Sequence, residues 1–142
     1  MDRCCGELLK QATTERLIAD YSQARIAMDY RRIAALLHPQ ARFIMPANAS
    51  ASPFSGECRG REHICELMRQ SDAMLEFYDV RILDALIDGC RAPVRWSAMH
   101  RNRGTGAALS VSGCAFITQA DGLINEYIHY VDTATINELA KQ

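Results

Sequence analysis

The chain has 142 residues, of which 49% are hydrophobic and 23% are charged, with sixteen basic and seventeen acidic side chains. This balance is typical of one globular domain, 1–142, built around a single core. The charges are mixed along the chain instead of being clustered, so we expect no nucleic-acid partner. No apolar segment approaches the ~20 residues of a membrane span, and the N-terminus lacks the apolar region of a signal peptide. We therefore expect a cytoplasmic protein without a membrane partner.

The six cysteines do not form a recognisable metal or disulfide pattern. None belongs to a C-x-x-C pair, and no histidine follows them at a zinc-finger spacing. We expect no metal and no cofactor, and we interpret the cysteines as small buried hydrophobic residues together with a flexible N-terminal pair. They are Cys4, Cys5, Cys58, Cys65, Cys90 and Cys114.

The first quarter of the chain predicts two helices. Apolar residues recur at helical spacing from Thr13 or Thr14 to Met28, and we expect residues 1–12 to be a flexible extension. A short second helix is predicted over Tyr30–Leu37. It ends before a proline, because the residue that precedes proline disfavours the helical conformation.

A strand, a loop and a third helix are predicted next. The strand covers Ala41–Met45 and is closed by Pro46. Residues 47–60 are rich in Ser, Gly, Pro and Asn and predict a long loop, whose length is typical of a rim or lid at a functional site. The third helix is predicted over Arg61–Met74, where one face is apolar.

The second half of the chain predicts four consecutive antiparallel strands and a last helix over Thr133–Lys141. Turns are predicted at Asp88-Gly89, at 102–106 and, most firmly, at Asp121-Gly122, because glycine supplies the positive φ that a two-residue hairpin turn requires. The strands are expected over 77–87, 93–101, 107–118 and 123–132. Helices followed by a strand meander indicate an α+β fold, in which a strongly curved mixed or antiparallel sheet wraps packed helices as a cone with a pocket at its open end.

The order of these elements, together with the segments FSGECRGREHICELM, VRWSAMHRNRGTG and ITQADGLINEYIHYVD, resembles the nuclear transport factor 2-like superfamily. The resemblance covers about residues 14–139 and is strongest to SnoaL-like and ketosteroid-isomerase-like members. It implies the cone-shaped α+β barrel, a small apolar ligand or substrate, and a homodimer formed through the outer face of the sheet. The superfamily includes isomerases, cyclases, hydrolases and non-catalytic binding modules, so it does not define one activity.

The resemblance also implies site positions. Tyr21 falls where ketosteroid isomerases have their oxyanion-stabilising tyrosine, whereas Met45 replaces their catalytic aspartate and Cys114 lies near their second aspartate. Against limonene epoxide hydrolases, Trp96 lies near the arginine of the catalytic triad and His129 lies at its final acid. Neither set of catalytic carboxylates is present in this chain.

His129 is the strongest catalytic candidate, because an imidazole suits general acid or base catalysis. By strand alternation it shares a face with Tyr127 and Val131, which we place toward the pocket. The alternative is a histidine packed in the sheet with both ring nitrogens hydrogen-bonded.

His100 and Tyr21 are further catalytic candidates. His100 shares a strand face with Trp96 and could form a proton relay with His129, or it could be a half-exposed strand end. Tyr21 could donate a hydrogen bond to a carbonyl or enolate oxygen, or it could be a core tyrosine. We expect five residues to contact substrate, namely Trp96, Met45, Tyr127, Cys114 and Phe116.

Two aspartates have structural interpretations. Asp132 precedes the last helix and is predicted to be its N-cap, with a catalytic role as the alternative. Asp29 is predicted to be a turn or cap residue between the first two helices.

The leading hypothesis is an isomerase, cyclase or hydratase/hydrolase that uses cofactor-free acid–base chemistry on an apolar carbonyl or cyclic substrate. The alternative is a non-catalytic ligand-binding or dimeric interaction module with the same cone.

Overall fold

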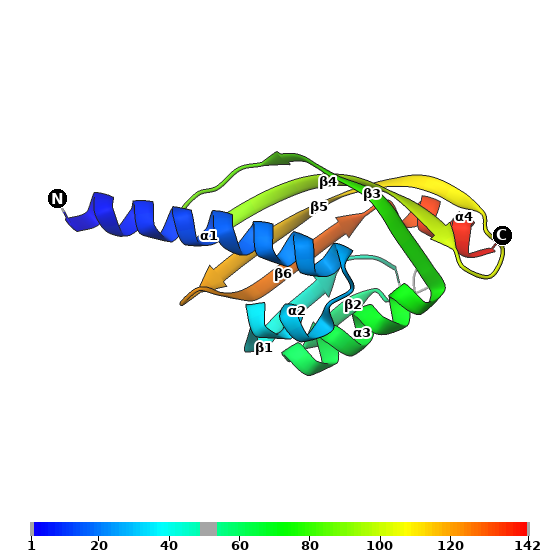
Figure 1. The fold of residues 1–142 in the computed structure, drawn as a ribbon, viewed down its shortest axis with the longest axis horizontal. Helices are drawn as coiled ribbons and strands as arrows, with labels where there is room; N and C mark the ends of the chain where they lie inside the picture. Colours follow the sequence, from blue (N-terminus) through cyan, green and yellow to red (C-terminus); the bar gives the residue numbers. More distant parts are fainter. Residues whose placement is uncertain (1, 49–53, 142) are drawn as a thin grey trace.

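The computed structural model describes residues 2–48 and 54–141, with side chains from residue 6 onward. Within this part of the chain it contains four helices and one curved sheet of six strands, as expected for an α+β cone (Figure 1). The helices are α1 (Asp2–Ile26), α2 (Tyr30–Leu36), α3 (Arg61–Met74) and α4 (Thr133–Lys141). The strands are β1 (Leu37–Met45), β2 (Gly56–Arg59), β3 (Leu75–Ala85), β4 (Arg91–Asn102), β5 (Ala108–Ala120) and β6 (Leu123–Val131).

The sheet is mixed, and its strand order is β2-β1-β6-β5-β4-β3. The four strands β3 to β6 form the predicted antiparallel meander, whereas β1 joins β6 in parallel. The hairpin between β5 and β6 turns at Asp121 and Gly122, with φ of 53° and 80°. This prediction is therefore confirmed, and so is the turn at Asp88-Gly89, which Asp88 and Arg91 close by mutual backbone hydrogen bonds.

Helix α1 runs along the concave side of the sheet and supplies the centre of the core. Its C-terminal half faces the sheet, whereas its first turns extend past the strands (Figure 1). Its buried apolar side chains recur at helical spacing and share one core cluster with residues of α2, α3 and the strands; they are Leu17, Ile18, Tyr21 and Ala24. The helices therefore form one wall of the cone and the sheet forms the other.

Three boundary predictions were wrong by more than two residues. Strand β1 begins at Leu37 instead of Ala41, so His38 and Pro39 belong to the strand. Helix α1 begins at Asp2 and not at Thr13 or Thr14, so residues 2–12 belong to the helix. The predicted loop 47–60 contains β2, which pairs antiparallel with β1 through the register Phe43↔Cys58. Residues 49–53 of that predicted loop lie outside the described residues.

Candidate functional site

A cavity of about 200 Å³ lies between the helices and the concave face of the sheet. Its sheet wall is a row of neighbouring rings from four strands, in which consecutive centroids are 5.1 to 6.2 Å apart. The row comprises Phe43, Tyr127, His129, Trp96, His100 and Phe77. The predicted strand faces are confirmed, because Trp96 and His100 of β4 and Tyr127 and His129 of β6 all line the cavity.

His129 lies in the middle of this row. Its Nε2 atom is buried and has no hydrogen-bond partner among the described residues. Burial, together with the positive charge of Arg25 and the neighbouring His100, lowers the pKa of His129 to about 4. At neutral pH the imidazole is therefore uncharged, and Nε2 can accept a proton or donate a hydrogen bond to a ligand.

His100 lies next to Trp96, with a ring-centroid distance of 6.1 Å, and it also lines the cavity. Its Nδ1 atom is buried and lacks a partner among the described residues, and burial lowers its pKa. The cavity thus holds two neutral histidines, each with a free ring nitrogen. Their rings lie on either side of Trp96, whose indole centroid is 5.4 Å from that of His129.

Tyr21 of α1 meets Tyr127 of β6 across the cavity, with ring centroids 5.3 Å apart. Burial raises the pKa of both phenols, and that of Tyr127 lies well above its usual value. Of the two phenols, the pKa of Tyr127 is the more strongly raised. Both residues line the cavity, where a phenol O–H can donate a hydrogen bond to a ligand oxygen.

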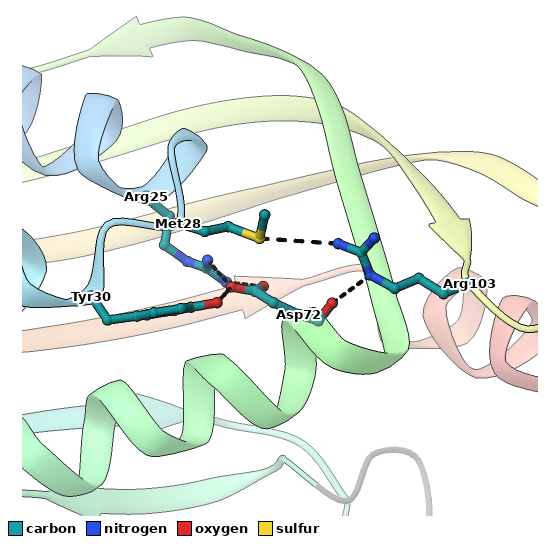
Figure 2. A network of polar contacts seen from close by, with 5 residues as sticks. All are labelled: Arg25, Met28, Tyr30, Asp72 and Arg103. Atoms are coloured by element: carbon teal, nitrogen blue, oxygen red, sulfur yellow. Dashed lines mark hydrogen bonds and ion pairs between the residues drawn. The ribbon is translucent and has the colours of Figure 1, made fainter.

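The sequence interpretation missed a charged pair that also lines the cavity, Arg25 of α1 and Asp72 of α3. Arg25 donates from Nη1 and Nη2 to the two carboxylate oxygens of Asp72 at 2.6 and 2.8 Å (Figure 2). The Tyr30 hydroxyl donates to the same carboxylate at 2.6 Å, and Arg103 Nε donates to the Asp72 carbonyl oxygen at 2.6 Å. No short sequence motif signals this network, because its members lie on α1, α2, α3 and the turn after β4.

Met45 lines the cavity as predicted, but Cys114 and Phe116 do not. Phe116 is 46% exposed on the outer face, where its ring contacts Tyr130. A register shift between Thr118 and Gln119 explains the difference, because it pairs His129 with Ala115 and Tyr127 with Ile117. The prediction that Cys114 and Phe116 contact a ligand in this cavity is therefore corrected in favour of Ala115 and Ile117.

Asp132 caps α4, as predicted. Its Oδ1 accepts the backbone N–H of Thr135 at 3.1 Å, and its Oδ2 accepts the Thr135 hydroxyl at 2.6 Å. These bonds lower the pKa of Asp132. Asp29 likewise caps α2 by accepting the backbone N–H of Arg32 at 3.1 Å.

The described cysteine side chains, at positions 58, 65, 90 and 114, are all free thiols, and those of Cys4 and Cys5 lie outside the described part. Among the described residues, no group of three or more His, Cys, Asp or Glu side chains is arranged to hold a metal ion. None of the described helices combines the length and the hydrophobicity that crossing a bilayer requires.

Solved structures of similar fold include three at 16 to 18% identity. An NTF2-like protein from Burkholderia xenovorans LB400 is 18% identical with a TM-score of 0.79, over 92% of this chain and 97% of that one. TerC, co-crystallised with polyporic acid, is 17% identical with a TM-score of 0.82, over 92% and 99%. An LEH-like epoxide hydrolase from M. tuberculosis is 16% identical with a TM-score of 0.74, over 92% of each chain. At such identities these likenesses show the fold alone.

A search of curated proteins found no match. The model of the SnoaL-like domain family, however, matches residues 18–127, which include both tyrosines of the cavity and most of its sheet wall. The expectation drawn from the sequence is confirmed at this level, and the chain belongs to the SnoaL-like family within the NTF2-like fold.

Proposed function

We propose that the protein is an acid–base enzyme that isomerises, cyclises or hydrates an apolar carbonyl or cyclic small molecule in this cavity. The observation that carries the proposal is the buried Nε2 of His129, which has no hydrogen-bond partner among the described residues although the side chain lines a mostly apolar cavity. A buried polar atom without a partner costs about 1–3 kcal/mol, so it indicates a function beyond packing.

The proposed step is proton transfer next to a carbonyl group. His129 Nε2 accepts a proton from the α-carbon, the C–H electron pair forms a carbon–carbon double bond, and the carbonyl π electrons move to oxygen. The O–H of Tyr21, whose ring lies 5.3 Å from that of Tyr127, stabilises the resulting enolate oxygen. The same proton is then returned to this or to a neighbouring carbon.

The low pKa of His129 is compatible with this step. Desolvation disfavours an isolated imidazolium ion, but in the proposed step the imidazolium forms together with an enolate anion a few ångströms away. The ion pair therefore exists only as the reaction proceeds, when it can lower the barrier. His100, on the other side of Trp96, is proposed to donate a second hydrogen bond to the developing oxyanion.

Hydrogen–deuterium exchange tests the proposal with a panel of cyclic ketones instead of one identified substrate. Each ketone is incubated with the protein in D₂O, and loss of the α-proton signals is followed by NMR. We expect exchange above the buffer rate for at least one ketone, and a decrease of about 100-fold or more in His129→Gln. The matched control is His63→Gln, because His63 is exposed on α3. A His129→Gln variant that exchanges as fast as the wild type would show that His129 is not the base.

The second candidate function is ligand binding without turnover. It is favoured by the mostly apolar lining and by the commitment of Asp72, the only carboxylate of the described lining, to Arg25 and Tyr30. Trp96 is the single tryptophan of the chain, so its fluorescence reports occupancy of the cavity. Saturable quenching of Trp96 by a ketone that undergoes no exchange would favour the binding module.

A homodimer through the outer face of the sheet is part of the proposal. It is supported by Phe116 and Tyr130, which are 46% and 50% exposed and pack edge to face there at 5.9 Å. Light scattering coupled to size-exclusion chromatography is expected to give a dimer for the wild type and a monomer for Phe116→Glu. A monomeric wild type would contradict this arrangement.

A further inference from the structure

Arg25 presents unused hydrogen-bond donors to the cavity. A guanidinium group carries five N–H donors, and the bonds to Asp72 use two of them, one on each terminal nitrogen. The side chain is 21% exposed, lines the cavity and lies over the Phe77 ring, with Cζ 4.6 Å from the ring centroid. Among the described residues no further partner is present for the remaining donors.

Arg25 is held in one orientation by the residues around Asp72. The carboxylate of Asp72, 4% exposed, accepts from both ends of the guanidinium fork and from Tyr30, while its backbone carbonyl accepts from Arg103 (Figure 2). Bidentate pairing fixes the plane of the guanidinium as well as its position. The free edge of Arg25 is therefore pre-organised, so a ligand oxygen that it binds need not pay for ordering the side chain.

The charge of the pair indicates which kind of oxygen fits. Arg25 and Asp72 are the only permanently charged residues of the described lining, and together they carry no net charge. A neutral acceptor keeps this balance, whereas a ligand carboxylate would leave one uncompensated negative charge in a desolvated space. The donors of Arg25 therefore suit the oxygen of a ketone or another neutral carbonyl group.

The position of Arg25 on α1 sets the spacing between two polar points of the cavity. Tyr21 and Arg25 are four residues apart on one face of the helix, a separation of about 6 Å along its axis. Both line the cavity, where Tyr21 lies against Tyr127 and Arg25 lies over Phe77 on the sheet wall. A ligand that reaches both residues therefore needs two separate oxygen functions.

We propose that Arg25 is a substrate-binding residue, and that the substrate is an uncharged cyclic compound with two oxygen functions on opposite sides of its ring. One oxygen lies at Tyr21 and His129, where the proposed proton transfer occurs, and the other accepts from the free edge of Arg25. The inference rests on the proposed function, because it assigns the class of molecule that the same cavity takes. It differs from a purely structural role, in which the Arg25–Asp72 pair only joins α1 to α3.

Two isosteric phenols test the inference. 4-Hydroxyacetophenone and 4-isopropylphenol share a phenol for the Tyr21 and His129 end, and they differ in a carbonyl oxygen that replaces a methyl group at the other end. Affinities are measured by calorimetry and by quenching of Trp96. In the wild type we expect 4-hydroxyacetophenone to bind at least as tightly as 4-isopropylphenol, although 4-hydroxyacetophenone is the less hydrophobic of the two.

The variant Arg25→Met/Asp72→Leu removes both charges together, so neither is left buried alone. We expect the affinity for 4-hydroxyacetophenone, relative to that for 4-isopropylphenol, to fall at least about tenfold, as for loss of a hydrogen bond to a charged donor. Arg25→Lys retains a cation for Asp72 but lacks the guanidinium fork. Most of the preference for 4-hydroxyacetophenone over 4-isopropylphenol is expected to be lost in this variant too. If the double variant does not fold, Arg25→Lys tests the inference in its place. Tyr30→Phe is the matched control, because it removes one bond to Asp72 from a residue outside the cavity lining. It is expected to keep the wild-type ratio.

The outcomes separate the two proposals. If neither phenol binds to the wild type, the cavity does not take such ligands, and both the proposed function and this inference are overturned. If both bind and the ratio is the same in the wild type and the Arg25 variants, only the inference is overturned. If the ratio of the two affinities falls as far in Tyr30→Phe as in the double variant, the Arg25–Asp72 pair has a structural role and does not bind the ligand directly. Tighter binding of 4-hydroxybenzoate than of either neutral phenol would overturn the assignment of an uncharged substrate.

Discussion

The indole of Trp96 lies directly over the backbone of Gly113, its partner on the neighbouring strand β5. A Cβ atom at position 113 would come within 2.7 Å of Trp96 Cζ2 and within 2.7 Å of the Tyr130 carbonyl oxygen. Only glycine therefore lets the indole lie across the sheet and face His129. The cavity wall at Trp96 therefore depends on glycine at position 113 as well as on the indole itself.

Gly113→Ala is expected to displace Trp96 and to destabilise the fold by about 1–3 kcal/mol, because the added methyl group overpacks a site bounded partly by backbone. Denaturant unfolding measures the stability, and the emission maximum of Trp96 measures the displacement. Gly6→Ala is the control, because nothing lies within 4 Å of a Cβ at that helical position. It is expected to stabilise α1 by about 0.5–1 kcal/mol, and a Gly113→Ala protein with wild-type stability and emission would contradict the packing argument.

His129 is expected to make the protein less stable as the pH falls from about 6.5 to about 4. Its pKa is 6.5 when unfolded and about 4 when buried, so in this range the unfolded chain binds more protons. The contribution of the uncharged, buried imidazole to the free energy of unfolding is fully present above pH 6.5 and is lost progressively as the pH falls through 4. It amounts to roughly 3 kcal/mol. Chemical denaturation at a series of pH values is expected to show a shallower dependence for His129→Gln than for the wild type. His63→Gln, which changes an exposed histidine in the same way, should follow the wild type, and identical curves for His129→Gln would refute the shifted pKa.

Thr14 links α1 to two turns of the sheet and is fully buried. Its Oγ1 lies 2.6 Å from the Gly89 carbonyl oxygen and 2.9 Å from that of Lys10, and it accepts from Gln119 Nε2 at 3.1 Å. Thr14→Val keeps the shape but removes the partner of the Gly89 carbonyl and the shortest bond of Gln119 Nε2, so we expect a loss of about 2 kcal/mol in the free energy of unfolding. Thr13→Val, at the neighbouring and less buried position, is expected to change it by no more than about 0.5 kcal/mol. Equal effects of the two substitutions would show that the hydroxyl of Thr14 is dispensable.

Asp132→Ala is expected to lower the melting temperature slightly without affecting exchange activity, because the carboxylate caps α4 and does not line the cavity. Asp132→Ser, which can accept the same backbone N–H, should restore most of the loss. Melting curves together with the D₂O exchange assay make the comparison. A loss of exchange in a fully folded Asp132→Ala protein would return this residue to the catalytic candidates.

The strand faces of the site could be predicted because side chains alternate regularly along β4 and β6. The same rule failed on β5, where a regular two-residue hairpin at Asp121-Gly122 would pair His129 with Cys114. The shift after Thr118 changes that register by one residue, and no local pattern in the sequence marks it. Arg25 and Asp72 were missed for a different reason. Their pairing depends on how α1 and α3 pack, which helical periodicity does not determine.

The parallel pairing of β1 with β6 has a consequence for how the chain folds. Phe43 lies beside Tyr127, 84 residues later, whereas the hairpins of β3 to β6 join neighbouring segments. Because contacts of long sequence separation form slowly, we expect the meander to assemble early and the N-terminal helices and β1 to join it late. Until then its aromatic row has no covering layer, so the surface that later lines the cavity is the one most exposed to self-association during folding. Stopped-flow refolding followed through Trp96 at increasing protein concentration would reveal this interval as a concentration-dependent phase.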